Sequence, residues 1–386
     1  MTQEPIRVAQ IMGKFNAGGV ESVIVNYYRN MNHDKVQFDF YTDADSSRPI
    51  PQELLDMGAR HIVLPPYQRL PEYLSALERD LQERHYQIVH SNLNTLSVFP
   101  LFAAWRAGVP VRIAHSHSTA GDGMDFKRDL IKYALRPFSK LFATHYFACS
   151  EHAGHWMFGD APFTLMPNAI DTERFAYNPR TRVELRQSLE LENKFVIGHV
   201  GRFSPQKNHD FLLNIFQEVC KKRDDCILML IGGLGTAGTD IEKNLRAKAE
   251  KMGLSDKVLF MGTYEDISGF YQVMNVFVLP SLYEGLPVTV VEAQAAGLPC
   301  VLSDRITREV KITEETYFLS LRDSPGAWAE RLLSFQGRER RDTAVEVWKA
   351  GFDIHEAAQK LESYYFEQAL CEQGEFSARE NAAYRR

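Results

Sequence analysis

The residues of this chain that most suggest chemistry are two glutamates, Glu284 and Glu292, in the stretch SLYEGLPVTVVEAQAAGLPCVLS. Glu284 lies in a Gly/Pro-marked loop after an apolar run, and Glu292 lies in a helical pattern that Pro287 would open. Free N–H groups at a helix start attract phosphate, and carboxylates accept hydrogen bonds from hydroxyls. The stretch therefore predicts a site for a diphosphate and sugar hydroxyls, the two parts of a nucleotide-sugar.

A pair of cations opens the second half of the chain. The run FVIGHVGRFSPQKNHD places Arg202 and Lys207 just after an apolar strand that ends in Gly201. Arginine offers a planar fork of donors and lysine a point charge, so both suit a diphosphate. Taken alone, the pair could be an ordinary solvated loop. Its position in the same half as the two glutamates favours one shared site.

The elements that must position these side chains follow an alternation of short apolar runs and helical patterns. The expected strands of the first half are Arg7–Met12, Val36–Tyr41, His61–Leu64, Gln87–His90, Val111–Ala114, His145–Cys149 and Phe163–Met166. Those of the second half are Phe195–Val200, Cys226–Ile231, Val258–Met261, Val276–Leu279, Cys300–Leu302 and Tyr317–Leu321. The alternation predicts an α/β protein with two Rossmann-like, doubly wound domains. Ligands bind at the carboxyl ends of such strands, so we expect the site in a cleft between the domains.

The domain boundaries are expected near a polar, proline-marked stretch, Asn168–Arg182, which we interpret as the linker. The first domain would then cover residues 1–175 and the second residues 176–352. A helical pattern follows, and a helix at about 353–386 would be free to pack back on the first domain.

Composition narrows the classes of protein that need to be considered. The 386 residues are 45% hydrophobic and 24% charged, which is typical of a soluble globular protein. The net charge of −6 gives no argument for nucleic acid as a partner. No apolar run reaches the ~18–20 residues that span a bilayer, and no signal peptide is visible. The five scattered cysteines suit a reduced, cytoplasmic protein.

Several separated motifs occur in a characteristic order. They are AGGVESVI near the N-terminus, MPNAID, GR-x-S-x-x-K, IGG and PSLYEGLP-x-x-x-x-E-A. With this combination the chain resembles the retaining glycosyltransferases of family 4, of the bacterial polysaccharide-biosynthesis type, which have the GT-B fold. The resemblance covers most of the chain. It implies transfer of a sugar from a nucleotide-sugar to an acceptor hydroxyl, with retention, in surface polysaccharide or glycolipid biosynthesis.

The resemblance also implies roles for particular residues. Arg202 and Lys207 would bind the donor diphosphate, Glu284 would contact the transferred sugar, and Glu292 would bind the ribose hydroxyls. The other residues expected at the donor are Gly201, Gly232, Gly233, Tyr264, Gly285, Leu286, Val288 and Thr289. Many members have Phe-Gly where this chain has Leu286-Pro287, so the donor sugar is not identified. The habits of the family favour UDP, with GDP next.

Two loops of the first half complete the expected site. Gly18 and Gly19 follow a strand and precede a helix, where missing Cβ atoms let a backbone approach a ligand; a plain turn is the alternative. His115 and His117 end another strand and point to the same side if the strand continues. The resemblance places a histidine here near the reacting centre. We expect His117 to be catalytic, with His115 as the second choice and a packed or capping histidine as the alternative.

Two further patterns suggest bound groups that we do not expect. Gly233 opens a literal G-x-G-x-x-G, but it follows the second strand of its domain, where a dinucleotide-binding loop would follow the first. Asp43 and Asp45 match the metal-binding D-x-D of another glycosyltransferase fold. A metal is redundant where cations and a helix N-terminus neutralise the diphosphate. We therefore expect no cofactor and no metal. A nucleotide-sugar epimerase, a sugar phosphorylase and a non-catalytic nucleotide-sugar-binding subunit stay open as alternatives.

The expected partners are a nucleotide-sugar donor and a glycan or lipid-linked acceptor. Residues 127–144 add the option of peripheral contact with the inner face of the membrane. Apolar residues recur there beside a cationic row at a spacing of four, made of Arg128, Lys132, Arg136 and Lys140. This pattern fits an amphipathic helix drawn to anionic lipid, or a core helix with a solvated basic face. Pro137 should interrupt it in either case.

Overall fold

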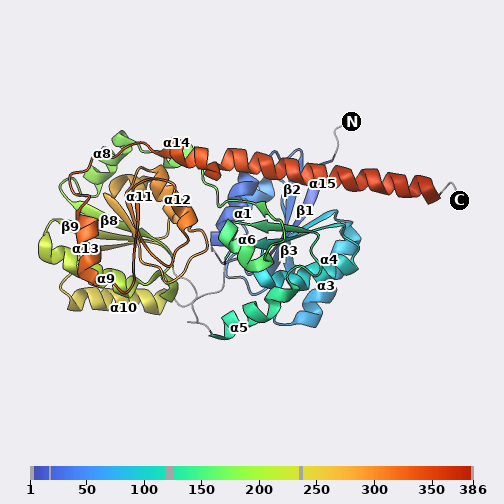
Figure 1. Ribbon diagram of the computed structural model, residues 1–386, viewed down its shortest axis with the longest axis horizontal. Helices are drawn as coiled ribbons and strands as arrows, with labels where there is room; N and C mark the ends of the chain where they lie inside the picture. The colour runs from blue at the N-terminus through green and yellow to red at the C-terminus, as the bar shows by residue number, and fades with distance from the viewer. Residues whose placement is uncertain (1–3, 17–18, 119–125, 234–237, 384–386) are drawn as a thin grey trace. The chain divides into compact units, whose positions relative to one another are not determined.

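The computed structural model of the chain describes residues 4–16, 19–118, 126–233 and 238–383 (Figure 1). The chain forms two compact units. Unit 1 comprises Met1–Ala169 together with Ile354–Arg386, and unit 2 comprises Ile170–Asp353. The chain therefore leaves unit 1, builds all of unit 2 and then returns.

Unit 1 is built on a seven-stranded sheet in the order β3-β2-β1-β4-β5-β6-β7, with every neighbouring pair parallel. Its strands are β1 (Ile6–Gly13), β2 (Val36–Asp43), β3 (Arg60–Leu64), β4 (Ile88–Ser91), β5 (Val111–Ser116), β6 (His145–Ala148) and β7 (Thr164–Leu165). Its α-helices are α1 (Gly19–Arg29), α2 (Gln52–Asp56), α3 (Leu70–Arg84), α4 (Val98–Arg106), α5 (Phe126–Leu135), α6 (Glu151–Phe158) and α15 (Ile354–Ala383).

Alternation along β1 shows how this sheet is covered on both faces. Ala9 and Ile11 belong to the hydrophobic cluster that also contains Leu77 of α3 and Leu101 of α4. Gln10, between them, points to the opposite face and contacts α15 through a hydrogen bond to Tyr365. Successive side chains of a strand point to opposite faces, so a parallel sheet needs helices on both.

Unit 2 is built on a six-stranded parallel sheet in the order β10-β9-β8-β11-β12-β13. Its strands are β8 (Phe195–Val200), β9 (Cys226–Ile231), β10 (Val258–Gly262), β11 (Val276–Leu279), β12 (Cys300–Ser303) and β13 (Thr316–Leu319). Its α-helices are α7 (Thr172–Phe175), α8 (Pro179–Ser188), α9 (His209–Lys222), α10 (Gly238–Lys251), α11 (Ser268–Val273), α12 (Val288–Ala295), α13 (Pro325–Leu333) and α14 (Ala344–Val347).

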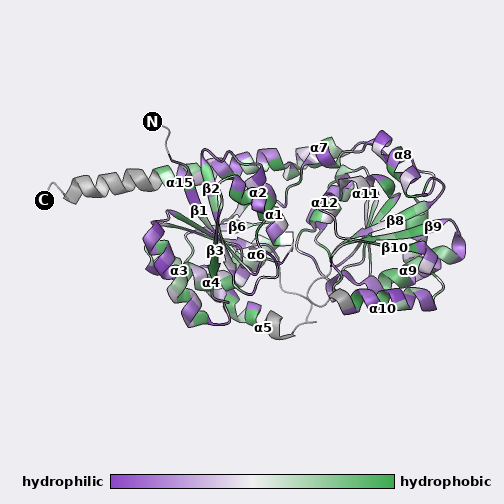
Figure 2. Cartoon of the chain, turned by 180° about the vertical axis from the view of Figure 1, so that it is seen from behind, coloured by the Kyte–Doolittle hydropathy of each residue, from purple (hydrophilic) through white to green (hydrophobic). Residues whose placement is uncertain are grey.

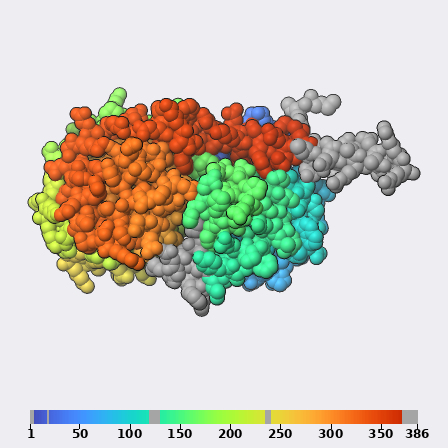
Figure 3. All heavy atoms as spheres, viewed as in Figure 1, coloured from blue at the N-terminus to red at the C-terminus, as the bar shows by residue number. Residues whose placement is uncertain are grey.

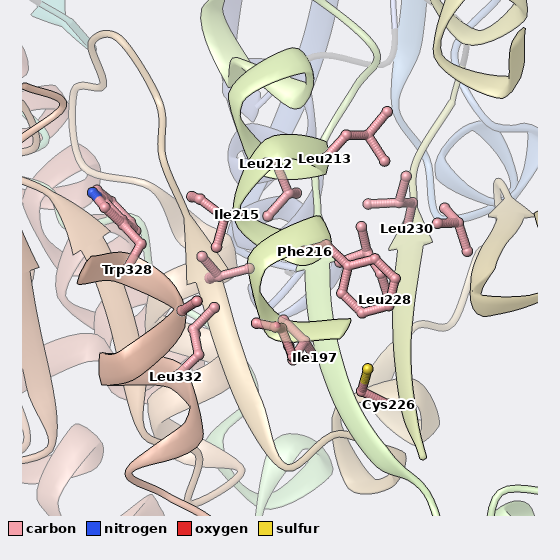
Figure 4. Packing of buried hydrophobic residues seen from close by; sticks show 14 of the residues in the cluster. Ile197, Leu212, Leu213, Ile215, Phe216, Cys226, Leu228, Leu230, Trp328 and Leu332 are labelled. Carbon is pink, nitrogen blue, oxygen red and sulfur yellow. The ribbon is translucent and has the colours of Figure 1, made fainter. Parts of the chain in front are cut away.

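The core of unit 2 lies between this sheet and helices α9 and α13. Leu212 and Phe216 of α9 pack on Ile197 and Leu228 of the central strands, and Trp328 of α13 is fully buried beside them (Figure 4). The strands are mostly hydrophobic along their length (Figure 2), as expected for a sheet buried on both faces. This rigid layer holds the strand ends on which the expected donor site depends.

Every strand expected from the sequence is present, and the boundary between the two units falls inside the stretch 168–182 where the linker was expected. Residues 168–182 are not an extended connection: they contain α7 and the start of α8. Helix α7 contacts α11, α12 and α14, so it belongs to unit 2, and the boundary falls after Ala169 and not after residue 175. The proline that suggested a linker, Pro179, occupies the first turn of α8, where proline is well tolerated.

Helix α15 attaches the end of the chain to unit 1. Glu362 accepts hydrogen bonds from the backbone N–H of Asn32, at 2.9 Å, and from the Nζ of Lys35, at 3.0 Å. Leu361 and Tyr365 are buried, whereas the side chains of the opposite helix face are exposed, and red atoms of this helix are visible at the surface in Figure 3. One face of α15 is therefore part of the core of unit 1.

Candidate active site

The loops at the carboxyl ends of β8, β9 and β10 are tied together by backbone hydrogen bonds. Gly201 N–H donates to the carbonyl of Ile231 at 2.9 Å, and Gly232 N–H donates to the carbonyl of Gly262 at 2.9 Å. A Cβ on Gly232 would lie 2.0 Å from the carbonyl oxygen of Gly201, so only glycine allows this approach. These hydrogen bonds and close contacts thus hold the ends of the three strands in fixed relative positions.

Lys207 and Glu284, on the segments that follow β8 and β11, form an ion pair. The Nζ of Lys207 lies 2.6 Å from Oε1 of Glu284, and their side chains are 14% and 9% exposed. Gln206 Nε2 donates to the other oxygen of Glu284 at 3.1 Å and to the carbonyl of Tyr283 at 2.9 Å. Two loops that are far apart in the sequence are therefore joined through charged and polar groups.

Gly201 determines the path of the Lys207 side chain. A Cβ built on Gly201 would lie 2.9 Å from the Cε of Lys207 and 3.1 Å from its Cδ. Any other residue would push the methylene chain of the lysine away from Glu284. Gly201, expected from the sequence at the donor, thus leaves room for the Lys207 side chain as it reaches Glu284.

Arg202 occupies a different environment from Lys207. Its side chain is exposed, and within the described ranges its guanidinium group forms no ion pair. Of the two cations, Lys207 is therefore bound to a carboxylate, whereas Arg202 is available to a ligand.

Glu292 lies on α12, with its carboxyl group almost completely buried. Tyr271 of α11 donates a hydrogen bond from its hydroxyl to Oε2 of Glu292 at 2.6 Å. Burial raises the pKa of Glu292 to about 7, although the Tyr271 hydrogen bond and the nearby charge of Arg174 both act to lower it. Such a carboxyl group binds or releases a proton near neutral pH, so hydroxyl binding to it depends on pH.

The N-terminus of α12 lies between the two glutamates in sequence. Pro287 precedes the helix without a side-chain cap, and in the described parts of the chain the N–H groups of Val288 and Thr289 donate to no protein acceptor. Leu286 is buried at 5% exposure, and Gly285 beside it is partly exposed. Among the described residues, the amides of Val288 and Thr289 are thus free to meet phosphate, a few positions after Glu284 in the sequence.

Tyr264 and Gly233 lie on the loops that follow β10 and β9. Tyr264 is 46% exposed, and its ring packs at a tilt of 57° on Phe270, with the centroids 4.6 Å apart. A Cβ on Gly233 would lie 2.7 Å from Oγ1 of Thr263, so these two loops also approach closely. The pattern that Gly233 opens runs into residues outside the described ranges.

Unit 1 carries a second group of expected site residues at the end of β5. His115 is fully buried on the strand, and His117 follows it at 7% exposure. Their rings stack with centroids 3.7 Å apart, so both lie on the same side. Nε2 of His117 lies 3.0 Å from Oδ1 of Asn92, and burial lowers the pKa of His117 to about 3. Gly19 opens α1, whereas Gly18 lies outside the described residues.

The D-x-D pattern has a local explanation. Asp45 forms an ion pair with Lys14 at 2.5 Å, and burial raises the pKa of Asp43 to about 6. Asp43 also accepts a hydrogen bond from the backbone N–H of Tyr67 at 3.4 Å. These contacts give the two aspartates roles within unit 1.

Sequence reasoning missed the residues that hold the expected ones. Tyr271, Gln206 and Asn92 each bind an expected site residue directly. Tyr271 stands in an apolar helix, where nothing in the sequence distinguishes it from a packed tyrosine. Gln206 stood inside the quoted motif between Arg202 and Lys207, and its position could have been a signal.

Two parallel α/β sheets, each with candidate ligand-binding groups at its strand ends, define the GT-B class of glycosyltransferase. Comparison with solved structures agrees: the chain superposes on Anabaena Alr3699/HepE in complex with UDP and glucose with a TM-score of 0.76, at 19% identity, over 93% of this chain and 99% of that one. A sucrose-phosphate synthase from Thermosynechococcus elongatus matches with a TM-score of 0.72, at 18% identity, over 97% and 100%.

Family comparisons identify the chain more narrowly. Residues 17–174 match the family described as Glycosyltransferase Family 4, and residues 181–344 match Glycosyl transferases group 1. A Bacillus subtilis protein named "Putative glycosyltransferase EpsF" is 34% identical over 95% of this chain and 97% of its own length. An Escherichia coli UDP-Gal:alpha-D-GlcNAc-diphosphoundecaprenol alpha-1,3-galactosyltransferase is 24% identical over 96% and 99%. The chain belongs to the family 4 glycosyltransferases, and its relatives include proteins named for lipopolysaccharide core and capsular polysaccharide biosynthesis.

Proposed function

We propose that this glycosyltransferase takes its sugar, a hexosyl or N-acetylhexosaminyl group, from a UDP-sugar. It transfers that group with retention to a hydroxyl of a glycan or lipid-linked acceptor. The observation that carries the proposal is the 2.6 Å ion pair between Lys207 and Glu284 beside the N-terminus of α12. It offers a cation and free amides to a diphosphate, and a carboxylate to a sugar hydroxyl, within one unit. The UDP-bound neighbour and the galactosyltransferase relative support the choice of nucleotide.

The chemical difficulty of the reaction is the separation of charge between an oxocarbenium-like sugar and a leaving diphosphate. Lys207, Arg202 and the amides of α12 would stabilise the leaving charge, because preorganised cations and dipoles act where negative charge develops. Glu284 would then exchange part of its contact with Lys207 for a hydroxyl of the transferred sugar. Glu292 would accept the ribose hydroxyls from its position on the same helix.

We also propose that the reaction needs no metal ion, because two cations and a helix N-terminus would together neutralise the diphosphate. Transfer measured with EDTA and with added Mg²⁺ or Mn²⁺ tests this. Equal rates are expected, and a rate that EDTA abolishes and a divalent ion restores would contradict the proposal.

Donor binding is tested with a thermal-denaturation panel of UDP, GDP, ADP and their sugars. A ligand that binds only the folded protein raises the melting temperature with its concentration. UDP and UDP-sugars are expected to give the largest rise, and an unchanged melting temperature with every nucleotide would contradict nucleotide-sugar binding. Product analysis without an acceptor completes the test: an altered sugar nucleotide would mean epimerase, and phosphate-dependent release of sugar phosphate would mean phosphorylase.

A lipid-linked acceptor would require the enzyme to work at a membrane surface, and α5 offers a contact. No helix in the described part of the chain is long and apolar enough to cross a bilayer. Helix α5 ends at Leu135, before Pro137, as expected. Four large apolar side chains of this segment are exposed by more than half, although Leu135 and Phe142 are partly buried: Leu130 by 57%, Ile131 by 52%, Phe138 by 51% and Leu141 by 63%.

We propose that this segment of unit 1 docks on an anionic bilayer. Arg136 and Lys140 lie among the exposed apolar side chains, and this combination suits the interface of such a membrane. The double variant Ile131→Ser/Leu141→Ser should lose sedimentation with vesicles that contain anionic phospholipid at low salt. Val63→Ser, which alters a 55% exposed side chain on β3, is the matched control. Equal sedimentation of the wild type and the double variant would refute the docking surface.

A further inference from the structure

Six buried polar side chains form a continuous hydrogen-bonded chain within unit 1. Gln10 contacts the Tyr365 hydroxyl at 3.1 Å and Asn92 at 3.0 Å, and Asn92 contacts Nε2 of His117 at 3.0 Å. From the same Tyr365 hydroxyl, a second branch runs at 2.6 Å to Nδ1 of His90. It continues at 2.9 Å from Nε2 of His90 to Nδ1 of His115, whose ring stacks on His117. We call these six residues the histidine circuit.

The three imidazoles of the histidine circuit are neutral at physiological pH. Burial lowers the pKa of His90 and of His117 to about 3, and lowers the pKa of His115 well below its usual value. The stacking of His115 on His117 at 3.7 Å also disfavours charge on either ring. A neutral imidazole has one N–H and one lone pair, so every hydrogen bond of the circuit has a direction.

The Gln10 side chain sets that direction along the first branch. Its Nε2 donates to the Tyr365 hydroxyl, and its Oε1 accepts from Nδ2 of Asn92. Oδ1 of Asn92 is then the atom that faces His117, and it can only accept. His117 must therefore carry its proton on Nε2, which leaves the lone pair on Nδ1.

The second branch is consistent with the same direction. The Tyr365 hydroxyl, which accepts from Gln10, is free to donate to Nδ1 of His90. His90 then has its proton on Nε2 and donates to Nδ1 of His115. If the Tyr365 hydroxyl donated to Gln10 instead, the Gln10 amide would have to turn round and His90 would have to donate from Nδ1, so both branches would reverse together.

We infer that Tyr365, on the helix that ends the described chain, is a positioning residue that fixes the tautomer of His117 through Gln10 and Asn92. The consequence for the reaction rests on the proposed function of His117 near the reacting centre. With its lone pair on Nδ1, His117 accepts a hydrogen bond from a substrate hydroxyl. In the opposite tautomer Nδ1 would carry the proton, and an N–H cannot accept a hydrogen bond from that hydroxyl.

A purely structural role would not require the Tyr365 hydroxyl. The ring already packs edge-on against Phe38 and His90 in the core of unit 1, and a phenylalanine would fill the same space. The hydroxyl is fully buried and is used in both branches of the circuit. A buried polar group of this kind is costly unless its hydrogen bonds are satisfied, and here they are.

The variant Tyr365→Phe tests the inference, and Tyr364→Phe is its matched control. Tyr364 is the next residue on the same helix, and its ring packs on Phe147 at 4.9 Å. In the described part of the chain its hydroxyl makes no hydrogen bond, so the control removes the same atom without opening the circuit. Circular dichroism and a melting curve establish that both variants are folded.

The decisive measurement is the ¹⁵N NMR signal pattern of the His117 ring, which distinguishes protonation at Nε2 from protonation at Nδ1. The wild type and Tyr364→Phe should show the Nε2–H form, and Tyr365→Phe should show a mixture or the Nδ1–H form. Turnover should fall roughly tenfold in Tyr365→Phe, with an unchanged KM for the donor and a control near wild type. Gln10→Met interrupts the same circuit from β1 if Tyr365→Phe does not fold.

The outcomes separate the inference from the proposed function. An Nε2–H His117 in folded Tyr365→Phe, or in Gln10→Met, would overturn the inference. A changed tautomer with unchanged turnover would overturn the link between His117 and the reaction while Tyr365 still positions the ring. Because the NMR measurement needs no substrate, a protein that transfers no sugar at all would contradict the proposed function alone.

Discussion

The strand ends of the two units use opposite kinds of polar group. In unit 2 the expected site consists of charged groups, which we call the charged end: Lys207 paired with Glu284, Arg202 exposed, and Glu292 able to titrate near neutral pH. In unit 1 it consists of neutral groups whose hydrogen bonds have fixed directions, which we call the neutral end. The difference suits the two tasks of glycosyl transfer, because a leaving diphosphate is stabilised by charge and a hydroxyl is recognised by direction.

The largest effect on turnover is expected when the charged end loses the cation of Lys207. Lys207→Ala should lower kcat by about 10²–10³, because it removes charge stabilisation of the leaving group. It also leaves Glu284 buried without its partner at 2.6 Å, so some loss of stability should accompany it. Steady-state transfer assays and thermal melts measure both effects.

A double variant distinguishes the two causes of that loss. Lys207→Ala/Glu284→Gln removes the unpaired buried charge and should recover stability but not turnover. Lys221→Ala, which alters an exposed lysine on α9, should behave as the wild type in both assays. Wild-type turnover in Lys207→Ala would show that the charged end is not where the leaving group is stabilised.

The second effect concerns Glu292 and should have opposite signs for stability and binding. Its pKa of about 7 in the folded protein exceeds its usual 4.5. The contribution of Glu292 to the free energy of unfolding is therefore fully present below about pH 4.5 and is lost as the pH rises through 7. Glu292→Gln does not titrate. Relative to the wild type, the free energy of unfolding of this variant should therefore be about 3 kcal/mol higher above pH 8 than at pH 4.5.

The measurement for Glu292→Gln is the melting transition that responds to added nucleotide, followed from pH 4.5 to 8. Isothermal titration of the same variant at pH 7.5 should show weaker binding of the parent nucleotide, because an amide is a poorer acceptor for ribose hydroxyls than a carboxylate. Unchanged affinity together with a pH-independent stability difference would remove Glu292 from the charged end.

The smallest effect is expected from Tyr271→Phe. Its hydroxyl donates to Glu292 at 2.6 Å and lowers the pKa of that carboxyl group, so its loss should raise the pKa further. The pH midpoint of nucleotide binding should move upward by up to about 1 unit, which corresponds to roughly 1.4 kcal/mol. The same change made in the Glu292→Gln background should move no midpoint, and a shift there would point to another titrating group.

The sequence was sufficient for the sheets and for the charged end, but not for the neutral end. Apolar runs between turn residues predict buried parallel strands well, and Lys207 and Glu284 lie in motifs of fixed spacing. The Gln10–Tyr365 hydrogen bond joins residues 355 positions apart, and no local pattern encodes it. The domain boundary was expected after residue 175 and falls after Ala169, and the helix start of α8 is signalled by its cap Asn178 and by Pro179.

The return of the chain to unit 1 has a consequence for the order in which the protein is made. Domains generally fold as units during synthesis, starting from the N-terminus. Here Gln10, His90 and His117 are synthesised before any of unit 2, but Tyr365 emerges only after all of it. A nascent or truncated chain that stops before α15 has all of the expected donor-binding residues and an incomplete histidine circuit. The histidine circuit of unit 1 is therefore complete only after the last helix has been synthesised.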